Sequence, residues 1–248
     1  MRRCSATPSK AHMNYPIYVF FGLIPSVIWL LFFLRKDSHP EHNPTIIKIF
    51  LYGMMAAIPA ALIELGIAEQ LKNLNFPHFL NQIIYIFLGI ALAEEFFKYL
   101  VVRKKILKHP EFDEPTDVML YMIISALGFA ALENLLILLP LANPFKFFET
   151  FVISGFRFVG ATFLHALASG VLGYFMAMSF FQPKNRTKLL LAGFIASVSL
   201  HGLYDLSIIE VDNGFKFAAP IIILAGLIVF VSLGFKKVEK LKSICLHK

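Results

Sequence analysis

Charged residues are scarce in this sequence. Asp, Glu, Lys and Arg together make up 16% of its 248 residues, whereas apolar residues make up 58%. A soluble domain has about 25% charged and about 45–50% apolar residues. The mean hydropathy is correspondingly high, at +0.70. This composition excludes an ordinary soluble domain and predicts an integral membrane protein.

Cysteine and long polar stretches are also nearly absent. The two cysteines, Cys4 and Cys245, lie in polar tails at opposite ends, so we expect neither a disulfide framework nor a cysteine-based metal site. No polar stretch is long enough to fold separately, so residues 1–248 are predicted to form a single integral membrane domain. The net charge of +7 comes from short basic tracts between apolar runs, which indicates membrane topology and not nucleic-acid binding.

Long apolar runs are what the sequence has instead. About 20 helical residues cross the hydrocarbon core of a bilayer. Seven runs reach that length, at Tyr15–Leu34, Thr45–Ala68, Phe79–Val102, Val118–Leu139, Phe147–Phe181, Leu189–Ile209 and Phe217–Phe235. The fifth run has 35 residues, too many for one straight crossing. We expect a short interfacial or re-entrant piece before Gly155 or Gly160, and an eighth span if that piece crosses.

The distribution of Lys and Arg predicts the orientation. With seven spans and the N-terminus outside, most basic residues of the connecting segments fall on the inner side. Cytoplasmic loops carry an excess of Lys and Arg. The sequence therefore favours an outer N-terminus and a cytoplasmic C-terminus, and an eighth span would reverse one end.

Ionisable and amide side chains interrupt the apolar runs. They are Glu64, Glu94, Glu95, Lys98, Glu133, Asn134, Arg157, His165, His201 and Asp205. An ionised group near the centre of a membrane helix costs about 2.5–3.5 kcal/mol, so such groups pair, lose their charge or line a wet cavity. Helical spacing lets one ammonium, Lys98, reach both Glu94 and Glu95. We predict an all-α polytopic bundle of seven to eight spans, whose polar stripes converge on an intramembrane cavity.

Carboxylates beside histidines suit the activation of water. One of two adjacent glutamates can accept a proton while the other stays protonated or pairs with a lysine. A histidine beside an amide or a carboxyl can stabilise an oxyanion. This set predicts peptide hydrolysis without a covalent nucleophile, and the sequence lacks HExxH, GxGD and GxSG motifs. No cofactor is required, although zinc held by His165, His201 and a glutamate is chemically allowed.

Five motifs carry a family resemblance. They are EEFFK (Glu94–Lys98), HPEFDEPTD after a basic loop, GFAALEN (Gly128–Asn134), HALASG (His165–Gly170) and HGLYD (His201–Asp205). Together they resemble the PrsW family of glutamic-type intramembrane endopeptidases, which are related to the CAAX prenyl endopeptidases. The resemblance covers roughly Phe79 to Asp205, about half of the chain, within a motif-bearing core of about residues 79–209. Lys98 stands one position before the family arginine, and Glu133 stands where the CAAX enzymes have histidine.

The resemblance implies roles for these residues. Glu94 and Glu95 would activate water, and Glu133 and His165 would assist. His201 would orient the water or stabilise the oxyanion. Lys98, Asn134 and Asp205 would support the site. The implied partners are a membrane-anchored protein substrate and the lipid bilayer of a bacterial cell, without nucleic acid; cleavage of an anti-sigma factor is the best-known example.

Two other classes of protein remain as alternatives. Intramembrane Glu, His and Lys also form proton relays in ion-coupled transporters. A transporter would be expected to contain an internal repeat, and none is visible in the sequence. A catalytically inactive membrane scaffold would retain the polar core for structure alone.

Overall fold

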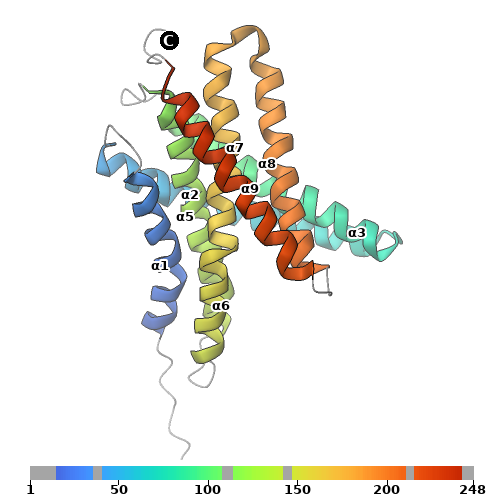
Figure 1. Cartoon of the computed structure of the whole chain (residues 1–248). Coiled ribbons are helices and arrows are strands. Elements are labelled where there is room, and N and C mark those ends of the chain that lie inside the picture. Colours follow the sequence, from blue (N-terminus) through green and yellow to red (C-terminus); the bar gives the residue numbers. More distant parts are fainter. Residues whose placement is uncertain (1–14, 36–40, 108–113, 142–146, 211–214, 242–248) are drawn as a thin grey trace, which may run out of the picture.

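The computed structural model describes residues 15–35, 41–107, 114–141, 147–210 and 215–241, and within these ranges it contains helices and no strands. The elements are α1 (Tyr15–Leu34), α2 (Asn43–Lys72), α3 (His78–Ile84), the π-helix η1 (Tyr85–Ala91), α4 (Leu92–Lys105), α5 (Pro115–Leu138), η2 (Leu139–Leu141), α6 (Phe147–Val159), α7 (Ala161–Phe181), η4 (Pro183–Asn185), α8 (Arg186–Ile209) and α9 (Phe215–Val238) (Figure 1). The predicted all-α class is confirmed. Cys4, Cys245 and most of the HPEFDEPTD loop lie outside the described residues.

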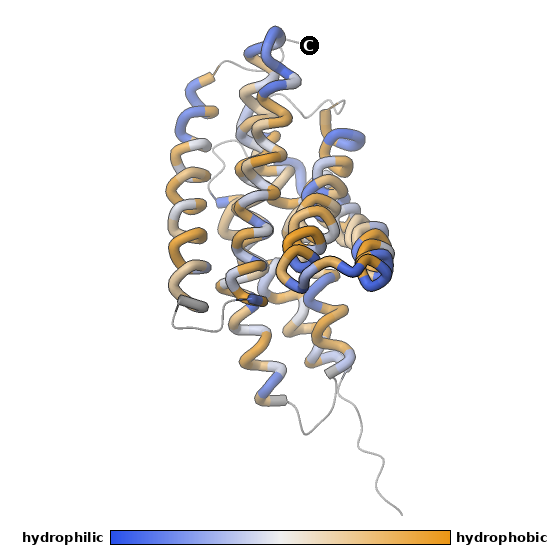
Figure 2. The backbone as a smooth tube through the Cα atoms, turned by 90° about the vertical axis from the view of Figure 1, so that its right-hand side faces the viewer, coloured by the Kyte–Doolittle hydropathy of each residue, from blue (hydrophilic) through white to orange (hydrophobic). Residues whose placement is uncertain are grey.

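Six segments in the described ranges are long and apolar enough to cross a membrane. They are Tyr15–Leu34, Asn43–Lys72, Pro115–Leu138, Phe148–Phe181, Pro183–Ile209 and Phe217–Val238. Six of the seven predicted runs correspond to them. The remaining run, Phe79–Val102, is divided among α3, η1 and α4 and carries three charged residues. Figure 2 shows helices that are mainly hydrophobic, with hydrophilic segments near their ends and turns.

Helix α5 forms the centre of the bundle. Every residue from Val118 to Ala131 is buried, and the helix packs against α1, α2, α4 and α7. It begins at Pro115, where a missing N–H costs no helical hydrogen bond. The backbone N–H of Glu114 also donates to Asp117 Oδ2 at 2.8 Å, as in a capping box. The most protected helix is therefore the one that carries Glu133 and Asn134.

Glycines let α2 and α5 touch through their backbones. A Cβ atom at Gly53 would overlap the carbonyl oxygen of Ser125, and one at Gly128 would overlap that of Phe50. Small residues permit such close approach between membrane helices. Gly202 similarly lets α8 approach the ring of Phe87 in η1.

Two local irregularities shape the helices around the site. The π-helix η1 ends at Ala91, immediately before the turn of α4 that carries the paired glutamates. Single π-helical turns inside helices occur frequently at functional sites. The long fifth run divides at Gly160, one of the two predicted break points, where φ is −95° and ψ is −93°. In Figure 1, α7 continues along the direction of α6, so the described part of this run shows no re-entrant turn.

Candidate active site

Lys98 is the centre of a buried polar network. Its Nζ donates to Glu94 Oε2 at 3.0 Å, to Glu95 Oε1 at 2.8 Å and to His165 Nδ1 at 2.8 Å. The side chain is completely buried, and Nζ also lies 4.5 Å from the centre of the Phe129 ring. A buried charge requires partners of this kind. The predicted reach of Lys98 to both glutamates is confirmed by these distances.

Glu95 is saturated by donors. Besides Lys98, Ser169 Oγ donates to its Oε2 at 2.7 Å, and Ser197 Oγ lies 3.0 Å from the same oxygen. His201 Nδ1 lies 3.0 Å from Oε1. Both oxygens of this fully buried carboxylate are therefore engaged. Such an environment stabilises the ionised form and holds the side chain in place.

Glu94 is much less engaged, although it is nearly as buried. Within the described residues it accepts one hydrogen bond, from Lys98. Its Oε2 also lies 3.4 Å from His165 Nδ1 and 3.8 Å from His201 Nε2. Glu94 is therefore the carboxylate with capacity left for water or another ligand, and it faces both histidines.

His165 connects Lys98 to Glu133. An ammonium has no acceptor, so Nδ1 of His165 must accept the hydrogen bond from Lys98. Nε2 then carries the proton and donates to Glu133 Oε2 at 2.8 Å. The ring is buried against Phe129 and against the ring of His201, whose centre lies 5.0 Å away.

Arg157 joins the network although it was not among the predicted site residues. Its Nη2 lies 3.0 Å from Glu133 Oε1, as an ion pair and not a well-aligned hydrogen bond, and its Nε donates to Asn134 Oδ1. Asn134 in turn donates to Thr162 Oγ1 at 3.0 Å. The charge of Arg157 within an apolar run was the available signal, but only the fold shows which carboxylate it meets.

His201 completes the cluster on α8. Its Nδ1 faces Glu95, while Nε2 lies 3.4 Å from Asp205 Oδ2. All the predicted site residues thus lie in one network, contributed by α4, α5, α7 and α8. The predicted convergence of polar residues from separate helices is borne out by these contacts.

The exposed fraction of the side chains differs from one side of the network to the other. The side chains of Lys98 and Glu95 are 0% exposed, whereas those of Glu133, Asp205 and Arg157 are 28%, 21% and 17% exposed. The half-buried Glu64 on α2 interacts electrostatically with Glu133 and Asp205 and forms no hydrogen bond among the described residues. The accessible edge of the network is therefore its Glu133 side.

One part of the network has the composition of a metal site. Glu94, His165 and His201 each offer a ligand atom, and these atoms lie within 4.8 Å of one another. Two histidines and a glutamate are a known donor set for catalytic zinc. The other ring nitrogen of each histidine faces a carboxylate, Glu133 or Glu95, as in the outer shell of many zinc sites. The donor set therefore fits a metal, but Lys98 is bonded to two of the same three side chains.

The family model and the individual relatives that match this chain name the same family. The model of the "PrsW family intramembrane metalloprotease" matches residues 41–236. Protease PrsW of Geobacillus kaustophilus is 34% identical over 74% of this chain and 76% of its own length. Protease PrsW of Oceanobacillus iheyensis is 29% identical over 74% and 79%, and that of Bacillus subtilis is 24% identical over 90% and 94%.

No solved structure matches the chain. The family model covers well over half of the residues and includes the whole buried network. The protein therefore belongs to the PrsW family of intramembrane proteases.

Proposed function

We propose that this protein hydrolyses a peptide bond in a membrane-anchored protein substrate, with Glu94 as the base that activates water. The observation that carries the proposal is the contrast between the paired glutamates. Glu95 is saturated by donors, whereas Glu94 faces His165 and His201 with capacity to spare. A general base must be within hydrogen-bond reach of the proton it removes.

The reaction assigns a role to each neighbour. Glu94 accepts a proton from water as the water oxygen attacks the scissile carbonyl carbon. A protonated His201, whose Nδ1–H donates to Glu95, directs its Nε2–H from Asp205 to the oxyanion that forms. The proton held by Glu94 then passes to the leaving nitrogen as the C–N bond breaks. Lys98 keeps both glutamates in position throughout.

The other residues of the polar network hold these catalytic side chains in position. Glu133 holds the tautomer of His165, and Arg157 holds Glu133. Asn134 bridges Arg157 and Thr162, which favours a positioning role over direct stabilisation of the oxyanion.

A metal-dependent form of the same hydrolysis is the second candidate. The family description names a metalloprotease, and Glu94, His165 and His201 would hold the ion. Such an ion supplies Lewis acidity and makes a bound water nucleophilic near neutral pH. In that case Glu133 and Glu95 would orient the two histidines, and Lys98 would release Glu94 and His165.

The membrane arrangement forms part of the proposal. We infer seven spans, with α3, η1 and α4 together as the third, around a polar intramembrane cavity. The ends of α1 and α9 and the α7–α8 turn lie toward one end of the molecule (Figure 1). Basic residues occupy that end, including Arg35, Arg186 and Lys236. The positive-inside rule then supports a cytoplasmic C-terminus in a bacterial membrane.

Comparative membrane proteomics tests the function. Source cells would express either the wild type or Glu94→Gln at matched protein levels. An intact membrane protein that accumulates in the variant, with loss of its shorter fragment, identifies the substrate. A single-span anti-sigma factor is one such candidate. An unchanged set of fragments, with the variant folded, would refute the role of Glu94.

Metal analysis separates the two mechanisms. The purified wild type in nanodiscs would be assayed for bound metal and for cleavage before and after chelation. Stoichiometric metal that is lost in His201→Ala supports the metal-dependent form. Cleavage that survives complete removal of metal supports Glu94 acting with Lys98.

A further inference from the structure

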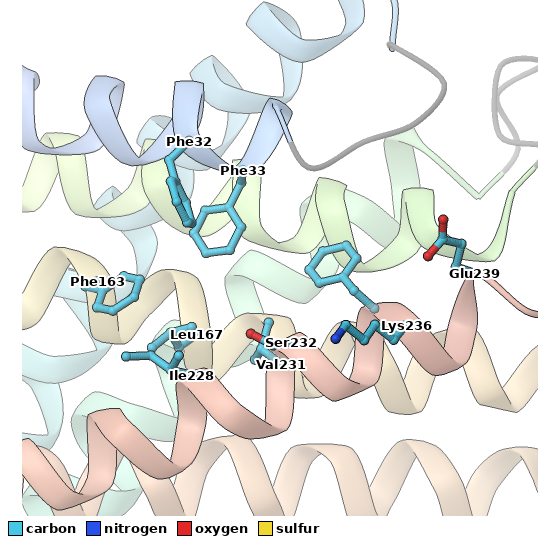
Figure 3. A pocket seen from close by; sticks show the side chains of 10 residues that line it. Phe32, Phe33, Phe163, Leu167, Ile228, Val231, Ser232, Lys236 and Glu239 are labelled. Carbon is cyan, nitrogen blue, oxygen red and sulfur yellow. The ribbon is translucent and has the colours of Figure 1, made fainter.

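An apolar pocket lies between α1, α7 and α9. It has a volume of about 280 Å³. Its walls are formed by Phe32 and Phe33 from α1, Phe163 and Leu167 from α7, and Ile228 and Val231 from α9 (Figure 3). Phe32 and Ile228 are 44% and 41% exposed, so the pocket opens at the surface of the bundle. None of its lining residues belongs to the polar network.

One end of the pocket carries two opposite charges. Lys236, in the last turn of α9, and Glu239, directly after the helix, stand three positions apart and line the pocket together with Ser232 (Figure 3). Both charged side chains are exposed, and neither has an ion pair or hydrogen bond within the described residues. The neighbouring Lys237 is directed elsewhere, because its Nζ lies 5.6 Å from the centre of the Tyr174 ring.

We propose that this pocket binds phosphatidylethanolamine. An acyl chain would fill the apolar part, the phosphate would meet Lys236, and the primary ammonium would donate to Glu239. The headgroup carries one anion and one cation, which complements Lys236 and Glu239 at the end of α9. A phosphatidylglycerol headgroup offers no cation to Glu239, and a choline headgroup has no N–H to donate.

The size of the pocket also favours a lipid chain over a protein segment. Ligand pockets of about 300–1,000 Å³ hold small molecules. A helix with its side chains is about 10–12 Å in diameter and would need a groove much larger than this pocket. The charged end of α9 lies at the same end of the molecule as the end of α1, where a headgroup would sit (Figure 1).

The site offers a built-in reporter. Trp29 is the single tryptophan of the chain, and its ring stacks on that of Phe163 with the centres 3.9 Å apart. Phe163 lines the pocket, so a chain bound there would lie close to the indole. Brominated acyl chains quench tryptophan fluorescence at short range.

The test compares this quenching between lipids that differ in their headgroups. The full-length protein in phosphatidylcholine nanodiscs would be titrated with brominated phosphatidylethanolamine or with brominated phosphatidylglycerol that carries the same chains. We expect half-maximal quenching at a several-fold lower mole fraction of phosphatidylethanolamine. Equal quenching by the two lipids would overturn the proposal.

Matched variants separate the pocket from ordinary lipid contact. Lys236→Gln and Glu239→Gln should each remove the headgroup preference, whereas Lys237→Gln should keep it. Ile228→Phe should fill the pocket and abolish preferential quenching, whereas Ile221→Phe, on an exposed part of α9, should not. A preference that survives both charge variants would refute the assignment. If a membrane-spanning substrate peptide protects Trp29 from quenching by both lipids, the pocket would be reassigned to the substrate.

Discussion

Replacing each of the paired glutamates by glutamine should separate stability from chemistry. Glu95→Gln removes a charge that Lys98 and His201 both face, within a fully buried site. Removing one partner of a buried ion pair costs about 3–5 kcal/mol when the other charge is left uncompensated. Lys98 keeps Glu94 as a partner, so the expected loss of unfolding free energy lies at the lower end, about 3 kcal/mol.

Glu94→Gln should have a much smaller effect on stability. The amide oxygen of glutamine can still accept the hydrogen bond from Lys98, and Lys98 keeps Glu95. The difference between a charged and a neutral acceptor suggests a loss of about 1 kcal/mol. Because glutamine cannot take a proton from water, proteolytic activity should fall to background in this variant.

The assay combines unfolding with substrate cleavage. Both variants and the wild type would be unfolded by denaturant titration in the same detergent or nanodisc, and cleavage would be measured at temperatures where each is folded. A Glu94→Gln variant that is less stable than Glu95→Gln would refute the conclusion that Glu95 is held by more hydrogen bonds than Glu94. A folded Glu94→Gln variant with normal cleavage would refute the role of this carboxylate as the base.

Three further predictions follow from individual contacts. Arg157→Met should reduce kcat for cleavage, because Glu133 loses the only cation that contacts it in the described structure. Arg157→Lys should restore part of kcat, and equal activity in both variants would argue against a positioning role. Gly128→Ala should destabilise the protein by about 1–3 kcal/mol, as overpacking does, whereas Gly66→Ala, which meets open space, should not; thermal unfolding in nanodiscs compares them. Gly160→Ala should also destabilise the protein, and Tyr204→Phe in the same chain should recover part of the loss, because the added Cβ meets the Tyr204 hydroxyl.

Composition and spacing determined the class of this protein. The apolar runs predict most of the helices because a bilayer crossing needs a minimum length of apolar helix, which is a local property of the sequence. The break in the fifth run followed from its length, and the structure divides it at Gly160, one of the two predicted positions. The helical period also placed Lys98 within reach of both Glu94 and Glu95.

Spacing could not predict which polar groups meet, because that depends on distances between helices far apart in the chain. Arg157 was visible as a charge in an apolar run, but its contacts with Glu133 and Asn134 require α6 and α5 to be placed side by side. The π-helix before α4 likewise has no clear sequence signal, although it sets the register of the turn that follows.

The different environments of two adjacent glutamates were decided by tertiary structure alone. Both lie in the same apolar run, and both lie within reach of Lys98 on their own helix. Serines from α7 and α8 saturate Glu95 and not Glu94. Hydrogen bonding depends on donor–acceptor distances of about 3 Å. The sequence therefore determined which residues gather in the membrane, and the packing of the helices decided which carboxylate is held in place and which is left available.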